Sequence, residues 1–188
     1  MTPDWVTTAA TVFTAVVIAA SAAAALIHIR HMRKGNEIEL MQKWTEAIES
    51  PEFESARMFV LNDLKRILAD PAQVRALSWQ DSLPRELVGM RAVCNHFESV
   101  GAFIKLGSVD ARVACELWSF VVLECWNAIA PVAALVRKNT GRDAIWENFE
   151  YLAALAERYI ASHPEGTYPK AIARMPVDTS LIELLDSE

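Results

Sequence analysis

The fold of this chain depends first on residues 5–34, which read WVTTAATVFTAVVIAASAAAALIHIRHMRK. The first 25 of them, Trp5 to Ile29, contain no Asp, Glu, Lys or Arg. A helix rises about 1.5 Å per residue, so this run reaches roughly 37 Å. Because a bilayer core is about 30 Å thick and a helix satisfies its own backbone, the run predicts one slightly tilted transmembrane helix.

Basic side chains flank only one end of this run. Arg30, Arg33 and Lys34 follow it, whereas Asp4 precedes it. The cytoplasmic flanks of membrane helices carry the excess of Lys and Arg. The pattern therefore predicts that the N-terminus lies outside and that the chain after residue 30 is cytoplasmic. The expected location is the inner (cytoplasmic) membrane of the cell. Trp5 lies where an aromatic anchor is expected. The predicted membrane-interface residues are therefore Trp5, Arg30, Arg33 and Lys34.

A cleaved signal peptide is the competing interpretation of the same run. It requires positive charge before the apolar stretch and a small-residue cleavage site after it. Ala22-Ala23-Ala24 would serve as that site, but residues 1–4 contain no Lys or Arg. The apolar stretch is also longer than a usual signal sequence, so an uncleaved anchor is favoured.

Small side chains recur every four residues along one face of the predicted span. They are Thr7, Thr11, Ala15, Ala19 and Ala23. Small residues at this spacing allow two membrane helices to approach closely, although an Ala-rich segment also produces the pattern by chance. This face is a candidate helix–helix packing surface.

The composition limits the partners of the remaining chain. The protein has 188 residues and a net charge of −6, with no basic face, which argues against nucleic acid. The expected partners are the lipid bilayer and either a second copy or another membrane protein. The three cysteines cannot all pair, so buried free thiols on a reducing side of the membrane are expected.

Apolar residues at helical spacing predict an all-α fold, with one N-terminal transmembrane helix and a bundle of four to five helices. Ser50-Pro51 and Asp70-Pro71 are helix starts, and Gly107 is a helix end. The predicted domains are an anchor with its basic flank (1–34), a helical bundle (35–162) and an acidic tail (163–188). The predicted helices after the uncharged run cover about 30–49, as a continuation of the membrane helix, and then 51–69, 84–106, 109–139 and 143–162.

The stretch from Val113 to Val136 allows two interpretations, because it is apolar nearly all round. It is long enough for a second span, but Glu116 and Glu124 would each cost about 2.5–3.5 kcal/mol at mid-bilayer. The central helix of a bundle is the favoured interpretation.

No motif in the chain predicts a specific reaction. Cys-x-x-Cys, Glu-x-x-His, a glycine-rich phosphate loop and Gly-x-Ser-x-Gly are all absent, so neither a metal nor a cofactor is expected. Polar side chains in apolar helices form one weak candidate for a buried site that binds a cation or moves a proton. They are Glu116, Glu124, Asn127, Glu98 and Glu150. Ion pairs that hold helices in register are the favoured interpretation.

Four blocks of sequence resemble a bacterial family of small, membrane-anchored helical proteins classed as a domain of unknown function. The blocks are Lys43-Trp44 with Ser50-Pro51-Glu52-Phe53-x-x-Ala56-Arg57; Asn95-x-Phe97-Glu98-x-x-Gly101-x-x-x-x-x-Gly107-x-x-Asp110; Leu117-Trp118, Cys125-Trp126 and Arg137; and Trp146-x-x-Phe149-Glu150-x-Leu152. The resemblance covers most of residues 5–155. It implies an anchored helical architecture and assigns no catalytic role.

The expected function is therefore a non-enzymatic interaction or regulatory module carried by a single-pass membrane protein. One rival is a membrane effector whose spans assemble in the bilayer, for example in stress or phage defence. The other rival is an enzyme or ligand-binding bundle that uses the buried carboxylates.

Overall fold

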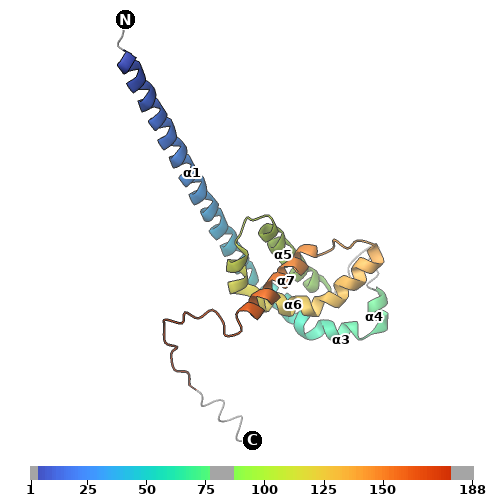
Figure 1. Cartoon of the computed structure of the whole chain (residues 1–188). Helices are drawn as coiled ribbons and strands as arrows, with labels where there is room; N and C mark the ends of the chain where they lie inside the picture. The colour runs from blue at the N-terminus through green and yellow to red at the C-terminus, as the bar shows by residue number, and fades with distance from the viewer. Residues whose placement is uncertain (1–3, 77–86, 179–188) are drawn as a thin grey trace.

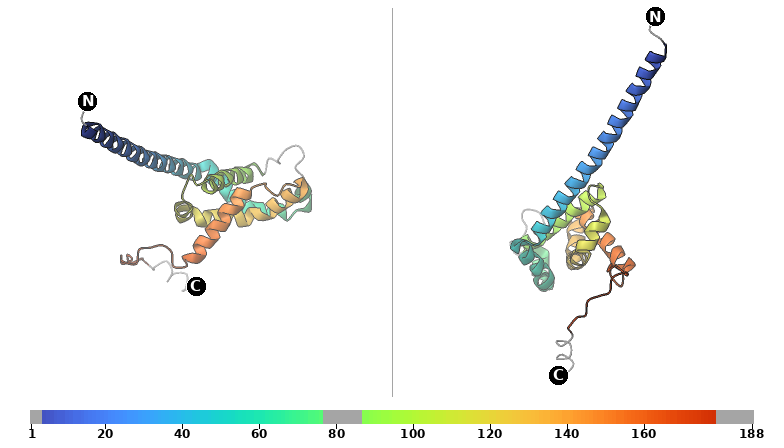
Figure 2. Two further views of the ribbon diagram at one scale, coloured as in Figure 1. Left: turned by 45° about the horizontal axis from the view of Figure 1, so that its top comes forward. Right: turned by 90° about the vertical axis from the view of Figure 1, so that its left-hand side faces the viewer.

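The computed structural model describes residues 4–76 and 87–178, and every regular element in these ranges is a helix (Figure 1). The predicted all-α class is confirmed. One long helix projects from a bundle formed by the other helices (Figures 1 and 2).

Helix α1 (Asp4–Ile48) is a single helix of 45 residues. It would be roughly 67 Å long at the usual rise of a helix. Residues 4–36 are exposed along their whole length, and Met41 and Trp44 alone in this helix are buried. Gly35 does not interrupt it, so the apolar half and the half that enters the bundle form one continuous rod.

A helical segment with a π-turn follows α1. It consists of α2 (Pro51–Met58), the π-helix η1 (Phe59–Asp63) and α3 (Leu64–Leu68), and the short α4 (Pro71–Ala76) comes next. The Ser50 hydroxyl accepts a hydrogen bond from the Phe53 N–H at 3.2 Å, which confirms the predicted N-cap. The predicted helix 51–69 is thus present, with one wider turn inside it.

The bundle is completed by α5 (Val88–Lys105), α6 (Ala111–Thr140) and α7 (Glu147–Ser162). Helix α7 packs against both α5 and α6, and α2 packs against α5. The predicted start of α5 at Pro84 lies outside the described residues. Gly107 and Gly141 follow α5 and α6 with φ of 71° and 65°, a conformation that glycine adopts without strain.

Two helices of the described chain, α1 and α6, are long and apolar enough to cross a membrane. They differ in burial, because the apolar window of α1 is fully exposed whereas α6 buries ten residues against its neighbours. Cys94, Cys115 and Cys125 are buried as free thiols. Burial raises the pKa of the Cys94 and Cys125 thiols, that of Cys125 to about 12, so both remain protonated near neutral pH.

After α7, residues 163–178 run as an extended tail without a helix. The tail runs below the bundle in Figure 1, whereas the free end of α1 lies above it. The right-hand view of Figure 2 shows the same arrangement. The last part of the predicted acidic tail, residues 179–188, lies outside the described residues.

Candidate interaction site at the base of α1

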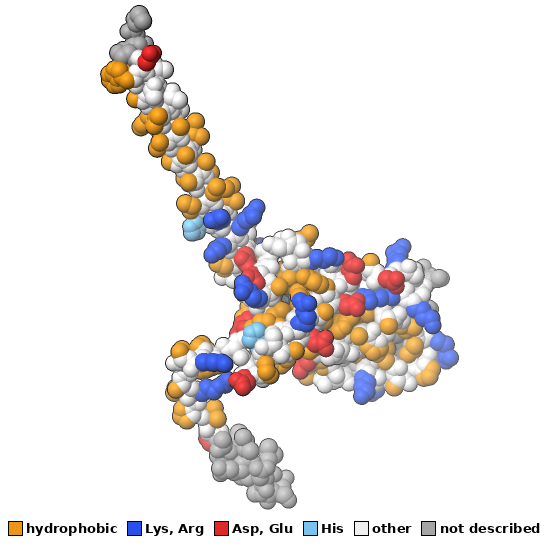
Figure 3. Space-filling view, viewed as in Figure 1, with side chains coloured by type: hydrophobic (Ala, Val, Ile, Leu, Met, Phe, Trp, Pro, Cys, Tyr) orange, Lys and Arg blue, Asp and Glu red, His pale blue; other side chains and the backbone are white. Residues whose placement is uncertain are grey.

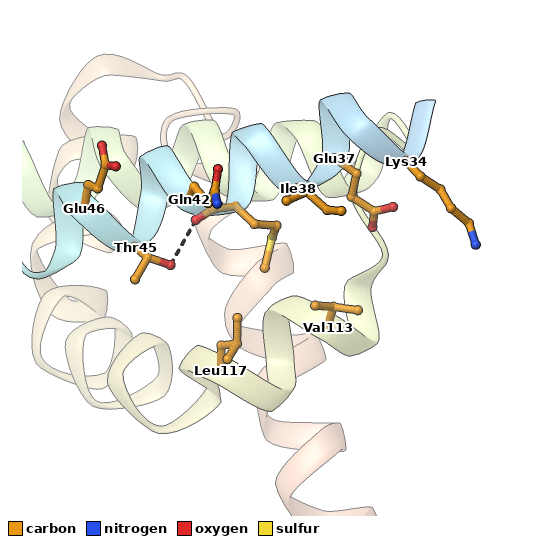
Figure 4. Close-up of a pocket in the computed structure, with 9 residues that line it drawn as sticks. Lys34, Glu37, Ile38, Gln42, Thr45, Glu46, Val113 and Leu117 are labelled. Atoms are coloured by element: carbon orange, nitrogen blue, oxygen red, sulfur yellow. Dashed lines mark hydrogen bonds between the residues drawn. The ribbon is translucent and has the colours of Figure 1, made fainter. Parts of the chain in front are cut away.

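An open groove lies where α1 meets the first half of α6 (Figure 4). We call it the α1–α6 groove, and its volume is about 680 Å³. Its lining residues are Lys34, Glu37, Ile38, Met41, Gln42, Thr45, Glu46, Val113 and Leu117. Val113 and Leu117 rise from α6 toward α1, and Ile38 lies on the α1 side (Figure 4).

Aromatic packing holds the two walls of the groove together. The ring of Trp44 lies 6.1 Å from that of Trp118 in an edge arrangement, and 5.9 Å from the ring of Phe103. The Glu37 carboxylate also accepts a hydrogen bond from the backbone N–H of Asp110 at 2.8 Å. These contacts fix α1 against the start of α6, so the groove is part of the packed fold.

The groove is uncovered, and apolar side chains from both walls lie among its polar ones: Ile38 and Met41 on α1, and Val113 and Leu117 on α6. Ile38 is 59% exposed and Leu117 is 56% exposed, and Phe120 continues the exposed row along α6 at 70%. Single exposed apolar residues are ordinary, but a contiguous group of large ones is typical of an interaction surface.

A polar cluster borders the groove at Glu116. Its carboxylate accepts hydrogen bonds from the Tyr159 hydroxyl on α7 and from the Thr167 hydroxyl on the tail. The bond from Thr167, and then that from Tyr159, lower the pKa of Glu116. The bond to Glu116 raises the pKa of Tyr159. The cluster ties the tail to the bundle, and its carboxylate stays ionised near neutral pH.

The structure does not gather the five predicted polar site residues into one buried cluster. Glu116, Glu124, Asn127 and Glu150 are exposed, so the expected burial is wrong for these four. For Glu116, Glu124 and Asn127 the reason is that α6 is covered on one side only, and these three lie on its open side. Glu150 lies at an exposed position of α7. Glu98 is half-buried and has a structural partner on another helix.

Glu98 caps the first turn of α7. Its carboxylate accepts hydrogen bonds from the backbone N–H groups of Asn148 at 3.1 Å and Phe149 at 2.9 Å, and from the Asn148 side-chain amide at 2.7 Å. The residue before this helix is Trp146, with a φ of 54°, and its indole has no acceptor that could cap the helix start. Helix α7 is therefore capped from α5, across about fifty residues of sequence.

Arg137 fixes the connection between α6 and α7. Its guanidinium donates to the backbone carbonyl of Ile145 at 2.9 Å and pairs with Glu150 at 2.7 Å. The favoured interpretation of ion pairs that hold helices in register thus describes Glu150 well. Among residues 4–76 and 87–178, no group of three or more His, Cys, Asp or Glu side chains has the geometry of a metal site.

His96 makes folding sensitive to acid. Its ring packs on Phe53 with 4.9 Å between centroids, and its Nε2 is buried without a hydrogen-bond partner in the described structure. Burial lowers the pKa of His96 to about 4, against about 6.5 in an unfolded chain. The unfolded state therefore takes up this proton first, and stability is lost as the pH falls from about 6.5 toward 4.

We expect the His96→Leu variant to lose less stability than the natural chain between pH 7 and pH 4.5, by about 2–3 kcal/mol. Urea unfolding in detergent, followed by tryptophan fluorescence, measures this difference. The matched control is His163→Leu, because His163 is exposed on the tail. Parallel pH dependence of the His96 variant and the natural chain would show that His96 is not the titrating group.

The predicted membrane residues all lie on the exposed part of α1. Trp5 is at one end of the apolar run, and Arg30, Arg33 and Lys34 are at the other. In the space-filling view, basic side chains gather where α1 approaches the bundle (Figure 3). Thr7, Thr11 and Ala15 line a shallow depression on α1 together with Ala10, Thr14 and Ile18. Ala19 and Ala23 lie further along the same helix, outside this depression.

These observations define the class of the protein, an all-helical bundle with a long N-terminal helix that is apolar enough to cross a membrane. The chain belongs to the family described as a domain of unknown function, DUF4760, whose model matches residues 15–156. The match takes in the second half of the apolar run, the α1–α6 groove and the Glu98 cap. No curated protein and no solved structure matches the chain.

Proposed function

We propose that this chain is a single-pass membrane protein whose bundle acts as a non-enzymatic interaction module on the cytoplasmic side. The observation that carries the proposal is the uncovered apolar groove at the base of a helix long enough to span a bilayer. The groove would bind an apolar segment of another protein at the membrane.

The exposed half of α1 is chemically suited to lipid. Its threonine hydroxyls donate within the helix, from Thr8 to the Asp4 carbonyl at 3.0 Å, from Thr11 to Thr7 at 2.9 Å and from Thr14 to Ala10 at 2.8 Å. Each hydroxyl therefore has a partner without water, which lowers the cost of placing it in hydrocarbon. Most of the remaining outer surface consists of alanine methyl groups and larger apolar side chains.

The charge pattern supports a cytoplasmic bundle. Arg30, Arg33 and Lys34 follow the apolar run, and the free cysteines of the bundle suit a reducing compartment. The small-residue depression on α1 favours a second copy of the chain as one partner, since it allows close helix approach. Self-association of this kind would also be the first step of a membrane effector.

A photo-crosslinking amino acid at position 117 tests the groove in intact cells. We expect it to give a discrete adduct, because Leu117 projects into the groove. The matched control is position 58, since Met58 is also a large exposed apolar side chain but lies on α2. Val113→Asp in the same chain should reduce the adduct at 117 several-fold, because it places a charge in the groove.

The mass of the adduct identifies the partner. An adduct of twice the chain mass indicates a second copy, and another mass indicates a different protein. Equal adduct patterns at positions 117 and 58, or no effect of Val113→Asp, would contradict a specific groove interaction.

A further inference from the structure

A second, more polar cleft lies on the side of α1 that faces the α5–α6 turn. It has a volume of about 480 Å³. Its lining residues are Arg33, Lys34, Asn36, Glu37, Leu40, Leu106, Gly107 and Ser108. We call it the turn cleft.

The position of the turn cleft along α1 matches the headgroup layer of the proposed membrane. Arg33 and Lys34 follow Ile29, the last residue of the uncharged run, by four and five positions. At 1.5 Å per residue they lie about 6–8 Å beyond it. The headgroup region on each side of a bilayer is about 5–7 Å thick, so both basic side chains reach it.

The turn brings an apolar side chain to the same place. Leu106 follows the end of α5, lines the cleft and is 78% exposed. The turn is held near α1 because the Asp110 N–H donates to Glu37 at 2.8 Å. An exposed leucine beside two basic side chains is the combination that binds a membrane surface, with the apolar group inserted and the cations on phosphates.

The charges around the cleft favour an anion. Arg33 and Lys34 face it with Glu37 as the one acid, and that carboxylate is already engaged by the Asp110 N–H. The nearby Asp110 carboxylate accepts from the Arg112 backbone N–H at 2.8 Å and pairs with its guanidinium at 3.3 Å. Lys105, at the end of α5, is paired with Glu147 at 3.0 Å. The two α1 cations therefore remain for an external anion.

We propose that the α5–α6 turn docks on the membrane surface, with Leu106 in the headgroup region and Arg33 and Lys34 on the phosphate of an anionic phospholipid. This inference rests on the proposed function, since α1 must cross the bilayer. Docking would hold the bundle in one orientation and leave the α1–α6 groove, on another side of α1, accessible.

Depth measurement by spin labelling tests the proposal on the full chain in lipid nanodiscs of phosphatidylcholine and phosphatidylglycerol. Nitroxides are attached at Leu106→Cys, Ala19→Cys and Met175→Cys in separate samples, and the unsubstituted chain, whose three cysteines are buried, gives the background. Met175 is the matched control, because it is 81% exposed and lies on the tail, away from the free end of α1.

We expect the Ala19 label to lie in the hydrocarbon and the Met175 label in water. The Leu106 label should lie at headgroup depth, with accessibility to a water-soluble nickel relaxant at least threefold lower than at Met175. Arg33→Gln with Lys34→Gln should move the Leu106 label toward water, whereas Lys65→Gln with Arg66→Gln on α3 should not.

The outcomes separate the two proposals. A Leu106 label as accessible as Met175, with Ala19 still in the hydrocarbon, overturns docking and leaves the anchor intact. A Leu106 label at equal depth in pure phosphatidylcholine, which has a phosphate but no net charge, overturns the proposed binding of an anionic phospholipid. An Ala19 label in water overturns the anchor itself.

Discussion

Gly101→Ala is expected to destabilise the bundle by about 3 kcal/mol or more, because the added methyl group has no space. A Cβ built at Gly101 lies 2.0 Å from the Asn148 carbonyl oxygen and 2.6 Å from its carbonyl carbon. Both atoms belong to the backbone at the start of α7, so no side-chain rotation relieves the contact. Helix α7 would have to move away from α5, and it packs against both α5 and α6.

The measurement is thermal or urea unfolding of the full chain in detergent, followed by near-ultraviolet circular dichroism. A domain of this size loses about 3–4 °C in Tm per kcal/mol, so a decrease of about 10 °C is expected. Gly35→Ala is the matched control, since the same change in α1 meets no atom within 4 Å. Alanine is the better helix former, so this variant should be as stable as the natural chain or slightly more stable. A Gly101 variant with unchanged Tm would mean that α5 and α7 are not in close contact.

The helical architecture was predictable because its signals are local. The uncharged run, the Ser50 hydroxyl and Gly107 each act within a few residues of where they stand, and the structure bears out the helix, the cap and the helix end that they predict. The π-turn at Phe59–Asp63 was not predicted, because the apolar stripe continues through it. Composition does not distinguish a π-turn from an α-turn.

The candidate sites were less predictable because they depend on which helices meet. The apolar character of α6 suggested complete burial, yet α5 and α7 cover only part of it and leave Leu117 and Phe120 exposed. The sequence places Glu98 in a candidate site for cation binding or proton transfer. It does not show that two backbone N–H groups of α7 donate to this carboxylate. The sequence does contain one signal of this contact, the spacing between Glu98 and Gly101. Residues three apart lie on the same face of a helix, and the start of α7 packs on this face of α5.

The second large effect is expected at Glu98 itself. Glu98→Ala removes the acceptor for the backbone N–H groups of Asn148 and Phe149 and for the Asn148 side-chain amide. Unsatisfied donors at a partly buried helix start cost about 1–3 kcal/mol, and loss of the negative charge there costs a further 0.3–1 kcal/mol or so. We therefore expect a loss of about 2–3 kcal/mol in the free energy of unfolding.

The Glu98→Gln variant distinguishes the hydrogen bonds of the cap from the packing of the side chain. Glutamine keeps the length and one acceptor oxygen, but its NH₂ group would face the Asn148 amide or a backbone N–H. The Glu98→Gln variant should lose about half as much free energy of unfolding as the alanine variant. The control is Glu157→Ala, at an exposed position on α7 itself, which should change the free energy of unfolding by less than about 0.5 kcal/mol. Equal losses for the two Glu98 variants would mean that the carboxylate charge and both oxygens are needed together. Losses below 0.5 kcal/mol for both would contradict the cap, and α7 would then be held by its buried side chains, such as Phe149 and Leu152, and by its ion pairs to α5 and α6.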